Sequence, residues 1–536
     1  MSPEVLDDPQ LADSTLEHAP ASAALPSDVA KHVVQGTSTL GAAVFVERGA
    51  SFLANVLAAR MAGASVFGAY SLGITTANNI STYAAGGIGT TATRFSGKYP
   101  YSGGNYRIFA QVMATISLLS AALAALALTL GAGPIARLLH KPDLIGLLQW
   151  AGITAAGMVL LECARGFFVG QRRLVALAAL SILVGAAMLA VLPAMALTHR
   201  PAAMVISHGV ITLTSVAVCC ALAVRLRLMP PAGAVPTIGF LPLLREVWSY
   251  GLIQLSGLVS ANLAGWWVTA LVARGDPSLV QISFFSIASQ LRNLIGLVPS
   301  LLTEGSFAVM ASPGEDGDTV SRRVMALCTF AATSVSLLVA ALTAIVAPLL
   351  LRLMYGRQYE SAALVVSVAV GVAVIQMGNA PPSARLSVVS IRFTAILNTV
   401  WAVFTAAVGT FLMLKGGSAA GAMGIFMAAH ILIAVMVLVV LQRRDRLPSG
   451  MIQLFAVSTM SIVLLAALAL LRANRLDLQL QATGLMIAVT AIAAAWLYRL
   501  GKHNDWLPSR EMLAALKQRF GGMTGKLFSR GRGGVA

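Results

Sequence analysis

The stretch "GAAVFVERGASFLANVLAAR", Gly41 to Arg60, is apolar, rich in small residues and as long as a helix that crosses a bilayer. It also carries Glu47 and Arg48 near its middle. A charged side chain at the bilayer centre costs roughly 2.5–3.5 kcal/mol on insertion scales. Adjacent side chains on a helix do not face each other. We therefore expect at least one of the two to meet a partner on another helix or a hydrated cavity.

Similar apolar windows recur along almost the whole chain of 536 residues. Hydrophobic residues make up 57% and charged residues 11% of the chain, whereas soluble domains have about 25% charged residues. This composition predicts an all-α polytopic membrane protein with about fourteen transmembrane helices. The expected spans are 37–60, 66–92, 107–130, 146–170, 174–197, 202–224, 246–273, 280–310, 324–350, 361–385, 393–414, 419–441, 451–471 and 479–500.

Three segments lie outside these spans. Residues 1–33 are acidic and rich in Ala and Pro, without the basic and apolar regions of a signal peptide, and are predicted to form a disordered tail. Residues 225–245 are expected to be a cytoplasmic linker, and residues 501–536 a basic cytoplasmic tail. The four cysteines fall inside spans and form no CxxC motif, so neither a disulfide framework nor a metal site is indicated. We expect no cofactor.

The distribution of basic residues predicts the orientation in the membrane. Loops after even-numbered spans carry fifteen Lys and Arg residues, and loops after odd-numbered spans carry ten. Because cytoplasmic loops are enriched in these residues, both termini are expected in the cytoplasm. The same bias accounts for much of the net charge of +17, so no nucleic-acid partner is needed to explain it.

The two halves of the chain share an ordered set of weak repeats. "CARGFFVGQRR" (163–173) returns as "SARLSVVSIRF" (383–393), "YSL" at 70 meets "FSI" at 285, and His208 meets His430. The offsets drift slowly, as in a duplication with small insertions. Residues 34–224 and 246–441 are therefore predicted to be two six-helix bundles of like orientation, with a site between them near the midplane. The spans in 451–500 are additional.

Three segments resemble the MOP superfamily of exporters, and most closely its polysaccharide flippases of the Wzx type. They are "ARMAGASVFGAYSLGITTANNISTYAAGGIGTTATR" (59–94), "LMYGRQYESAALVVSVAVG" (353–371) and "GGSAAGAMGIFMAAHI" (416–431). The resemblance implies flipping of an undecaprenyl-pyrophosphate-linked oligosaccharide across the bacterial inner membrane by alternating access. Membrane lipid, H+ or Na+ as coupling ion, and polysaccharide polymerase or export proteins are the partners it implies.

Arg48, Arg165 and Arg292 are the basic residues expected inside spans. Guanidinium groups bind phosphate oxygens in pairs and stay charged, so Arg48 and Arg292 are predicted to hold the pyrophosphate. Lipid II flippases of the same superfamily use cavity arginines on spans one and eight, where these two residues lie. The competing interpretation is that Arg48 and Glu47 form interhelical salt bridges. Arg165 is expected to pair with Glu162, one turn away on the same face.

Uncharged and titratable side chains inside the spans are further candidates. Amides suit sugar hydroxyls, although they also join membrane helices; those predicted to contact sugar are Asn78, Asn262, Gln290 and Asn379. Residues that could couple transport to an ion are Glu47, Glu304, His208 and His430, although a buried histidine is more often a hydrogen-bonded core residue.

Two other function classes stay open. One is a cation-coupled exporter of small molecules, of the multidrug type; such exporters usually have twelve spans and carboxylates in the cavity. The other is a membrane-embedded polysaccharide polymerase or glycosyltransferase. The chain has no long loop and no catalytic constellation that would favour an enzyme, so we expect none.

Overall fold

A computed structural model describes residues 27–99, 101, 103–226, 228, 236–311, 317–414, 416–444 and 447–507. This part of the chain is helical and contains no strand, which confirms the predicted all-α class. The α-helices are α1 (Ser27–Ala62), α2 (Ala64–Ala85), α3 (Ile88–Lys98), α4 (Tyr106–Leu138), α5 (Ile145–Gly170), α6 (Leu174–Ala196), α7 (Pro201–Arg225), α8 (Phe240–Gly275), α9 (Val280–Ala311), α10 (Gly317–Met354), α11 (Ala363–Val389), α12 (Ile391–Met413), α13 (Ala419–Arg444), α14 (Met451–Asn474) and α15 (Gln479–His503).

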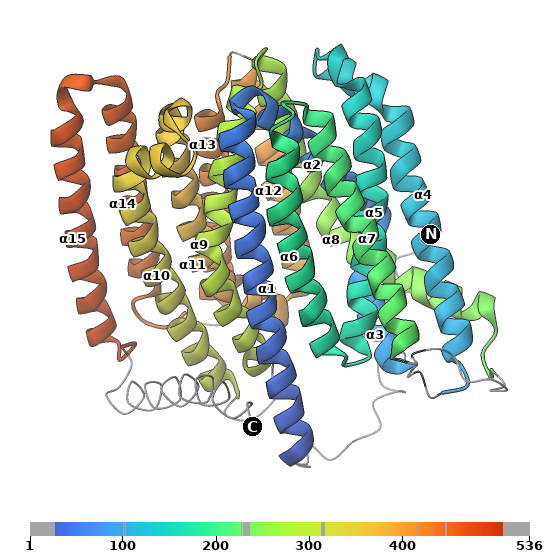
Figure 1. Cartoon of the computed structure of the whole chain (residues 1–536). Helices are drawn as coiled ribbons and strands as arrows, with labels where there is room; N and C mark the ends of the chain where they lie inside the picture. The colour runs from blue at the N-terminus through green and yellow to red at the C-terminus, as the bar shows by residue number, and fades with distance from the viewer. Residues whose placement is uncertain are drawn as a thin grey trace, which may run out of the picture.

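Helices of membrane-spanning length make up the body of the molecule (Figure 1). Within the described residues, eleven are long and apolar enough to cross a membrane. The helices α2, α8 and α9 have 22, 36 and 32 residues. At a rise of about 1.5 Å per residue they also reach across a bilayer, and they carry many of the polar side chains discussed below. Each predicted span except the second coincides with one helix.

The outer surface of the bundle is apolar. On α4, five leucines are 54–69% exposed: Leu118, Leu119, Leu123, Leu126 and Leu130. Monomeric soluble proteins rarely expose a continuous apolar surface of this kind. These side chains suit contact with lipid tails, and a multi-pass membrane protein follows from them and from the spans.

The second span is broken, whereas the sequence predicted one helix over 66–92. Gly86 and Gly87 separate α2 from α3 with φ of 51° and 73°. This left-handed region is open to glycine at no steric cost. After the break, α3 packs closely on α5: a Cβ at Gly166 of α5 would collide with the carbonyl oxygen of Gly89 of α3. The break therefore directs α3 toward α5.

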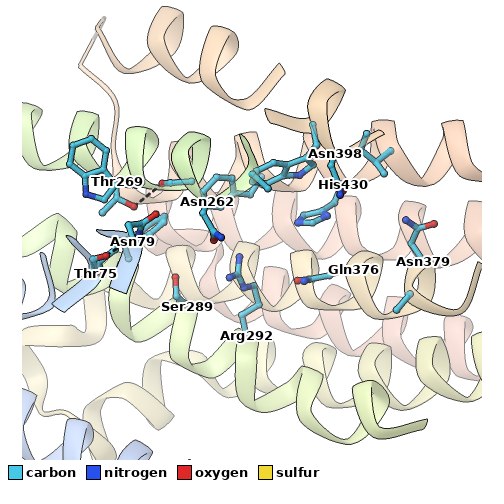
Figure 2. Close-up of a pocket in the computed structure, with 18 of the residues that line it drawn as sticks. Thr75, Asn79, Asn262, Thr269, Ser289, Arg292, Gln376, Asn379, Asn398 and His430 are labelled. Atoms are coloured by element: carbon cyan, nitrogen blue, oxygen red, sulfur yellow. Dashed lines mark hydrogen bonds between the residues drawn. The ribbon is translucent and has the colours of Figure 1, made fainter. Parts of the chain in front are cut away.

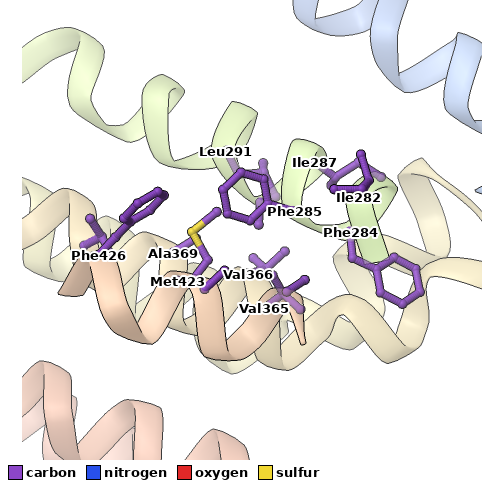
Figure 3. Close-up of a cluster of buried hydrophobic side chains, with 14 of the residues drawn as sticks. Ile282, Phe284, Phe285, Ile287, Leu291, Val365, Val366, Ala369, Met423 and Phe426 are labelled. Carbon is purple, nitrogen blue, oxygen red and sulfur yellow. The ribbon is translucent and has the colours of Figure 1, made fainter. Parts of the chain in front are cut away.

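The helices form two bundles with the same pattern of contacts. In the first, α5 packs on α2, α4 and α7, and α1 packs on α6; in the second, α11 packs on α9, α10 and α13, and α8 packs on α12. Figure 3 shows part of the second core, where Phe285 of α9, Ala369 of α11 and Met423 of α13 come together. The additional helices α14 and α15 pack on α10 and α11 at one edge of the molecule (left in Figure 1).

Two predicted tail and linker segments are partly helical. Residues 27–33 of the expected disordered tail belong to α1, and α8 begins at Phe240, inside the expected linker 225–245. The start of α8 is apolar as well as basic, and Leu243 and Val247 pack with Phe109 of α4. Residues 508–536, most of the predicted basic tail, lie outside the described residues.

The bundles meet at the end where α1 passes into α2. Ser65 Oγ donates to Ser278 O at 2.6 Å, and the Tyr359 hydroxyl donates to Ala59 O at 3.0 Å. A Cβ at Gly68 would collide with the carbonyl oxygen of Leu279. Only glycine allows this approach of α2 to the turn before α9, so the two bundles are in backbone contact here.

The bundles also meet at the opposite end, through α3 and α8. Lys98 Nζ donates to Glu246 Oε1 at 2.7 Å, and this bond raises the pKa of Lys98. The Arg94 guanidinium lies 4.4 Å from the centre of the Tyr250 ring. Both side chains of the ion pair are about half exposed, at 50% and 46%, so this contact is open to screening by salt.

Candidate functional site

Three adjoining cavities lie within and between the bundles. The central cavity, about 510 Å³, has walls from α1 and α9. The first-bundle cavity, about 640 Å³, shares Glu47, Ser51 and Asn55 with it. The second-bundle cavity, about 550 Å³, shares Arg292 and Gln376 with it. Polar side chains are thus continuous from one bundle to the other.

Arg48 and Arg292 both line the central cavity. Arg48 lies 14 residues before the end of α1 and Arg292 lies 12 residues after the start of α9, so at about 1.5 Å per residue both are roughly 20 Å from the same end of the bundle. Neither makes a salt bridge with the part of the chain that the structure describes, and the Arg292 Nε is buried without a hydrogen-bond partner. The structure brings these two predicted site residues together as unpaired cations.

Glu47 has its partner on another helix. Arg165 Nη2 of α5 donates to Glu47 Oε1 of α1 at 2.5 Å. The predicted pairing of Arg165 with Glu162 is therefore wrong, and an interhelical salt bridge forms at Glu47 but not at Arg48. The carboxylate of Glu162 instead lies beside Gly89 of α3, because the close packing of α3 on α5 covers that face of the helix. The two adjacent charges of α1 thus differ, since Glu47 is bridged and Arg48 faces the cavity.

The first-bundle cavity holds the remaining predicted residues of that half. Asn78 and Glu162 line it together with Arg165. His208 also lines it, and its Nδ1 lies 3.2 Å from the Tyr70 hydroxyl. A hydrogen bond of this kind is what a structural histidine in a protein interior requires.

The second-bundle cavity is lined by amides and aromatic rings. The predicted residues Asn262, Asn379 and His430 lie here, with Gln376 and Arg292, and Figure 2 shows Arg292, Gln376 and His430 directed toward one space. Asn379 Nδ2 donates to Ser383 Oγ at 3.1 Å, while its Oδ1 is buried without a partner. Among the described residues that line this cavity none is acidic, so its one formal charge is positive.

The two other predicted residues belong to α9. Gln290 lines the central cavity, where its Nε2 lies 3.4 Å from Ser286 Oγ and its Oε1 has no partner among the residues that the structure describes. The side chain of Glu304 lies outside the described residues, although its backbone belongs to α9. No group of three metal-ligating side chains occurs in the described ranges.

Sequence reasoning missed Trp401 and Asn398 of α12, which both line the second-bundle cavity. The Trp401 ring centre lies 5.8 Å from that of Phe426 and 5.6 Å from that of His430. Tryptophan in a membrane helix is enriched at the interfaces, whereas Trp401 lies near the middle of Ile391–Met413. That position was the signal available in the sequence.

Comparison with known proteins places the fold. No family model and no curated protein matches the sequence. Among solved structures, the lipid II flippase MurJ in its inward closed conformation aligns with a TM-score of 0.62 and 12% identity, over 86% of this chain and 98% of that chain. An inward-facing multidrug resistance MATE family transporter of the MOP superfamily aligns with a TM-score of 0.54 and 16% identity, over 74% and 96%. A MOP superfamily transporter from Pyrococcus furiosus aligns with a TM-score of 0.50 and 13% identity, over 78% and 96%. At these identities the chain shares the fold of these flippases and transporters.

Proposed function

We propose that the protein is a transporter that moves an undecaprenyl-pyrophosphate-linked oligosaccharide across the bacterial inner membrane by alternating access between its two bundles. The observation that carries this proposal is that Arg48 and Arg292 line the central cavity and pair with no acidic side chain in the described ranges. A diphosphate supplies the anion that Arg48 and Arg292 lack, and charge-assisted hydrogen bonds of this kind are roughly twice as strong as neutral ones. The amides of the adjoining cavities offer both donors and acceptors to sugar hydroxyls.

The comparisons support a lipid-linked substrate more than a small soluble one. The flippase that shares the fold acts on lipid II, as its name says, and its alignment covers a larger share of this chain than that of the multidrug transporter. The glycan would serve exopolysaccharide, capsule or O-antigen synthesis, in company with polymerase and export proteins. Both termini would lie in the cytoplasm.

A transport assay in proteoliposomes tests the proposal. A fluorescent undecaprenyl-pyrophosphate oligosaccharide is reconstituted, and a membrane-impermeant quencher reports how much has changed leaflet. We expect Arg48→Ala and Arg292→Ala each to abolish transport, and Arg→Lys to restore part of it because lysine keeps the charge and loses the fork. Arg137→Ala, at an exposed position near the end of α4, is the control for loss of a positive charge. Normal transport by the double Ala variant would refute the proposal.

A second candidate is a cation-coupled exporter of small organic cations. Glu47 and Glu162 on the first-bundle cavity favour it, since carboxylates can hold a proton, Na+ or a cationic drug. Susceptibility of an expressing strain to cationic drugs separates the two: an exporter lowers susceptibility without any effect on surface polysaccharide.

A further inference from the structure

The duplicated histidines have different surroundings. The repeat places His430 where the first bundle has His208, and Phe285 where the first bundle has Tyr70. Tyr70 supplies the hydroxyl that meets His208, whereas a phenylalanine has none to offer. His430 accordingly makes no hydrogen bond with a described residue, and it faces the second-bundle cavity.

Unsatisfied polar atoms gather on this same cavity. Trp401 Nε1, Arg292 Nε and Asn379 Oδ1 are each buried without a hydrogen-bond partner in the described part of the chain. Buried polar groups in native proteins are nearly always paired. Two donors and one acceptor left open around one space are therefore a pattern that a ligand can complete.

Aromatic rings lie beside these polar atoms. Trp401 and Phe426 stack with an angle of 25° between their planes, and the His430 ring is tilted by 48° relative to the Trp401 ring. A binding cavity with apolar rings and a few placed polar groups holds a ligand that has one apolar face and several hydroxyls. A pyranose ring has this shape, with C–H groups on its face and hydroxyls around its rim.

We propose that the second-bundle cavity is a carbohydrate subsite for the sugar that carries the phosphate. Its ring would lie on Trp401 and His430, and its 1-phosphate would face Arg292 at the junction with the central cavity. The absence of acidic side chains among the described lining residues suits an anionic group. The proposal rests on the proposed function, because that function supplies a sugar next to a phosphate.

Saturation-transfer NMR on the purified full-length protein in detergent tests this subsite with soluble probes. The probes are the 1-phosphates of glucose, galactose, N-acetylglucosamine and glucuronic acid, compared with inorganic phosphate by competition. We expect at least one sugar phosphate to bind roughly tenfold more tightly than inorganic phosphate, a gain of the size of one or two hydrogen bonds. If no sugar phosphate binds more tightly than inorganic phosphate, the subsite does not exist.

Variants test the role of the Trp401 ring. Trp401→Leu should remove the preference for sugar phosphate while the affinity for inorganic phosphate stays, which also shows that the protein is folded. Trp401→Phe keeps a ring and should lose only part of the preference. The matched control is Trp150→Leu, because Trp150 is 45% exposed and lines none of the three cavities. An unchanged preference in Trp401→Leu would overturn the inference.

The two proposals fail in different ways. If the protein prefers sugar phosphates through Trp401 but moves no lipid-linked oligosaccharide in proteoliposomes, the proposed function fails and the subsite stands. If it moves the oligosaccharide and Trp401→Leu changes neither transport nor sugar preference, the subsite fails and the function stands.

Discussion

Arg472 is expected to fasten the two additional helices to the second bundle. It is only 8% exposed, and from α14 its guanidinium donates to the carbonyl oxygens of Ala344 and Ile345 in α10, both at 2.8 Å. Pro348 lies four residues after Ala344 and has no N–H to donate. The Ala344 carbonyl oxygen therefore depends on Arg472 for a hydrogen bond. The Ile345 carbonyl oxygen also accepts the helical hydrogen bond from the backbone N–H four residues later.

This geometry predicts an uneven loss. In Arg472→Met, the Ala344 carbonyl becomes a buried acceptor without a donor, which costs about 1–3 kcal/mol. The Ile345 carbonyl keeps its helical bond and contributes little. We therefore expect a destabilisation of about 2 kcal/mol, nearly all of it from one carbonyl. Replacing Pro348 by Ala supplies the missing N–H and should return most of that amount.

A double-mutant cycle in mixed micelles measures this coupling. The unfolding free energies of the wild type, Arg472→Met, Pro348→Ala and the double variant are compared by titration with sodium dodecyl sulfate. Pro348→Ala should be more favourable in the Arg472→Met background than in the wild type by about 1–2 kcal/mol, because only there does the new N–H meet an unpaired carbonyl. Arg475→Met, at a surface-exposed position, is the control and should change stability little. Equal effects of Pro348→Ala in both backgrounds would refute the reasoning.

Three further contacts give testable expectations. Glu47→Gln and Arg165→Gln should each destabilise the first bundle, because each single change leaves one charge unpaired. The double variant should lose no more stability than either single variant. Expression levels and unfolding of the three proteins measure this. Gly68→Val should prevent the approach of α2 to the turn before α9. A cysteine placed at the central cavity should then react faster with a thiol reagent that enters from that end. An unchanged labelling rate would show that this contact does not close the cavity. At the opposite end, 1 M salt shortens the Debye length to about 3 Å, and the ions reach the Lys98–Glu246 pair because both side chains are half exposed. The pair should weaken, and labelling from the α3 side should increase. Equal labelling at low and high salt would show that the apolar contacts alone hold this end.

The fold could be predicted because its signals are local. Span length and apolarity decide a transmembrane helix, and thirteen of the fourteen expected spans correspond to one helix each, while the second is divided between α2 and α3. The ends of the helices were harder to predict, because the helices extend beyond the apolar windows in the sequence. The expected spans end at residues 385 and 471, but α11 continues to Val389 and α14 to Asn474, and Arg385 and Arg472, at and just beyond those expected ends, are both buried. Hydropathy detects the lipid-facing length of a helix and does not detect the turn that is shielded by neighbours.

For the site as well, local features could be predicted and contacts between distant helices could not. The sequence showed that Arg48 and Arg292 have no acidic partner nearby on their own helices, because spacing along the chain fixes which side chains are neighbours on a helix. The sequence did not show that Glu47 pairs with Arg165, 118 residues away, because this contact depends on how α1 and α5 lie relative to each other in the folded bundle. The local pair of Glu162 and Arg165 met the spacing rule and was still wrong. Spacing permits a contact, and the packing of a third element decides whether it forms.

The duplication offers a test of which residues belong to the scaffold and which to a ligand. Positions that serve the architecture recur in both copies, as with Arg165 and Arg385 or His208 and His430. Recurrence alone misjudges His430, however, because the repeat places Phe285, which has no hydroxyl, where the first bundle has Tyr70. A repeated side chain that lacks its internal partner in one copy is free to serve a ligand there without any change of its own. For a chain built of two like bundles, the informative comparison is therefore between the surroundings of equivalent residues, and the places where these surroundings diverge are where a ligand site should be sought.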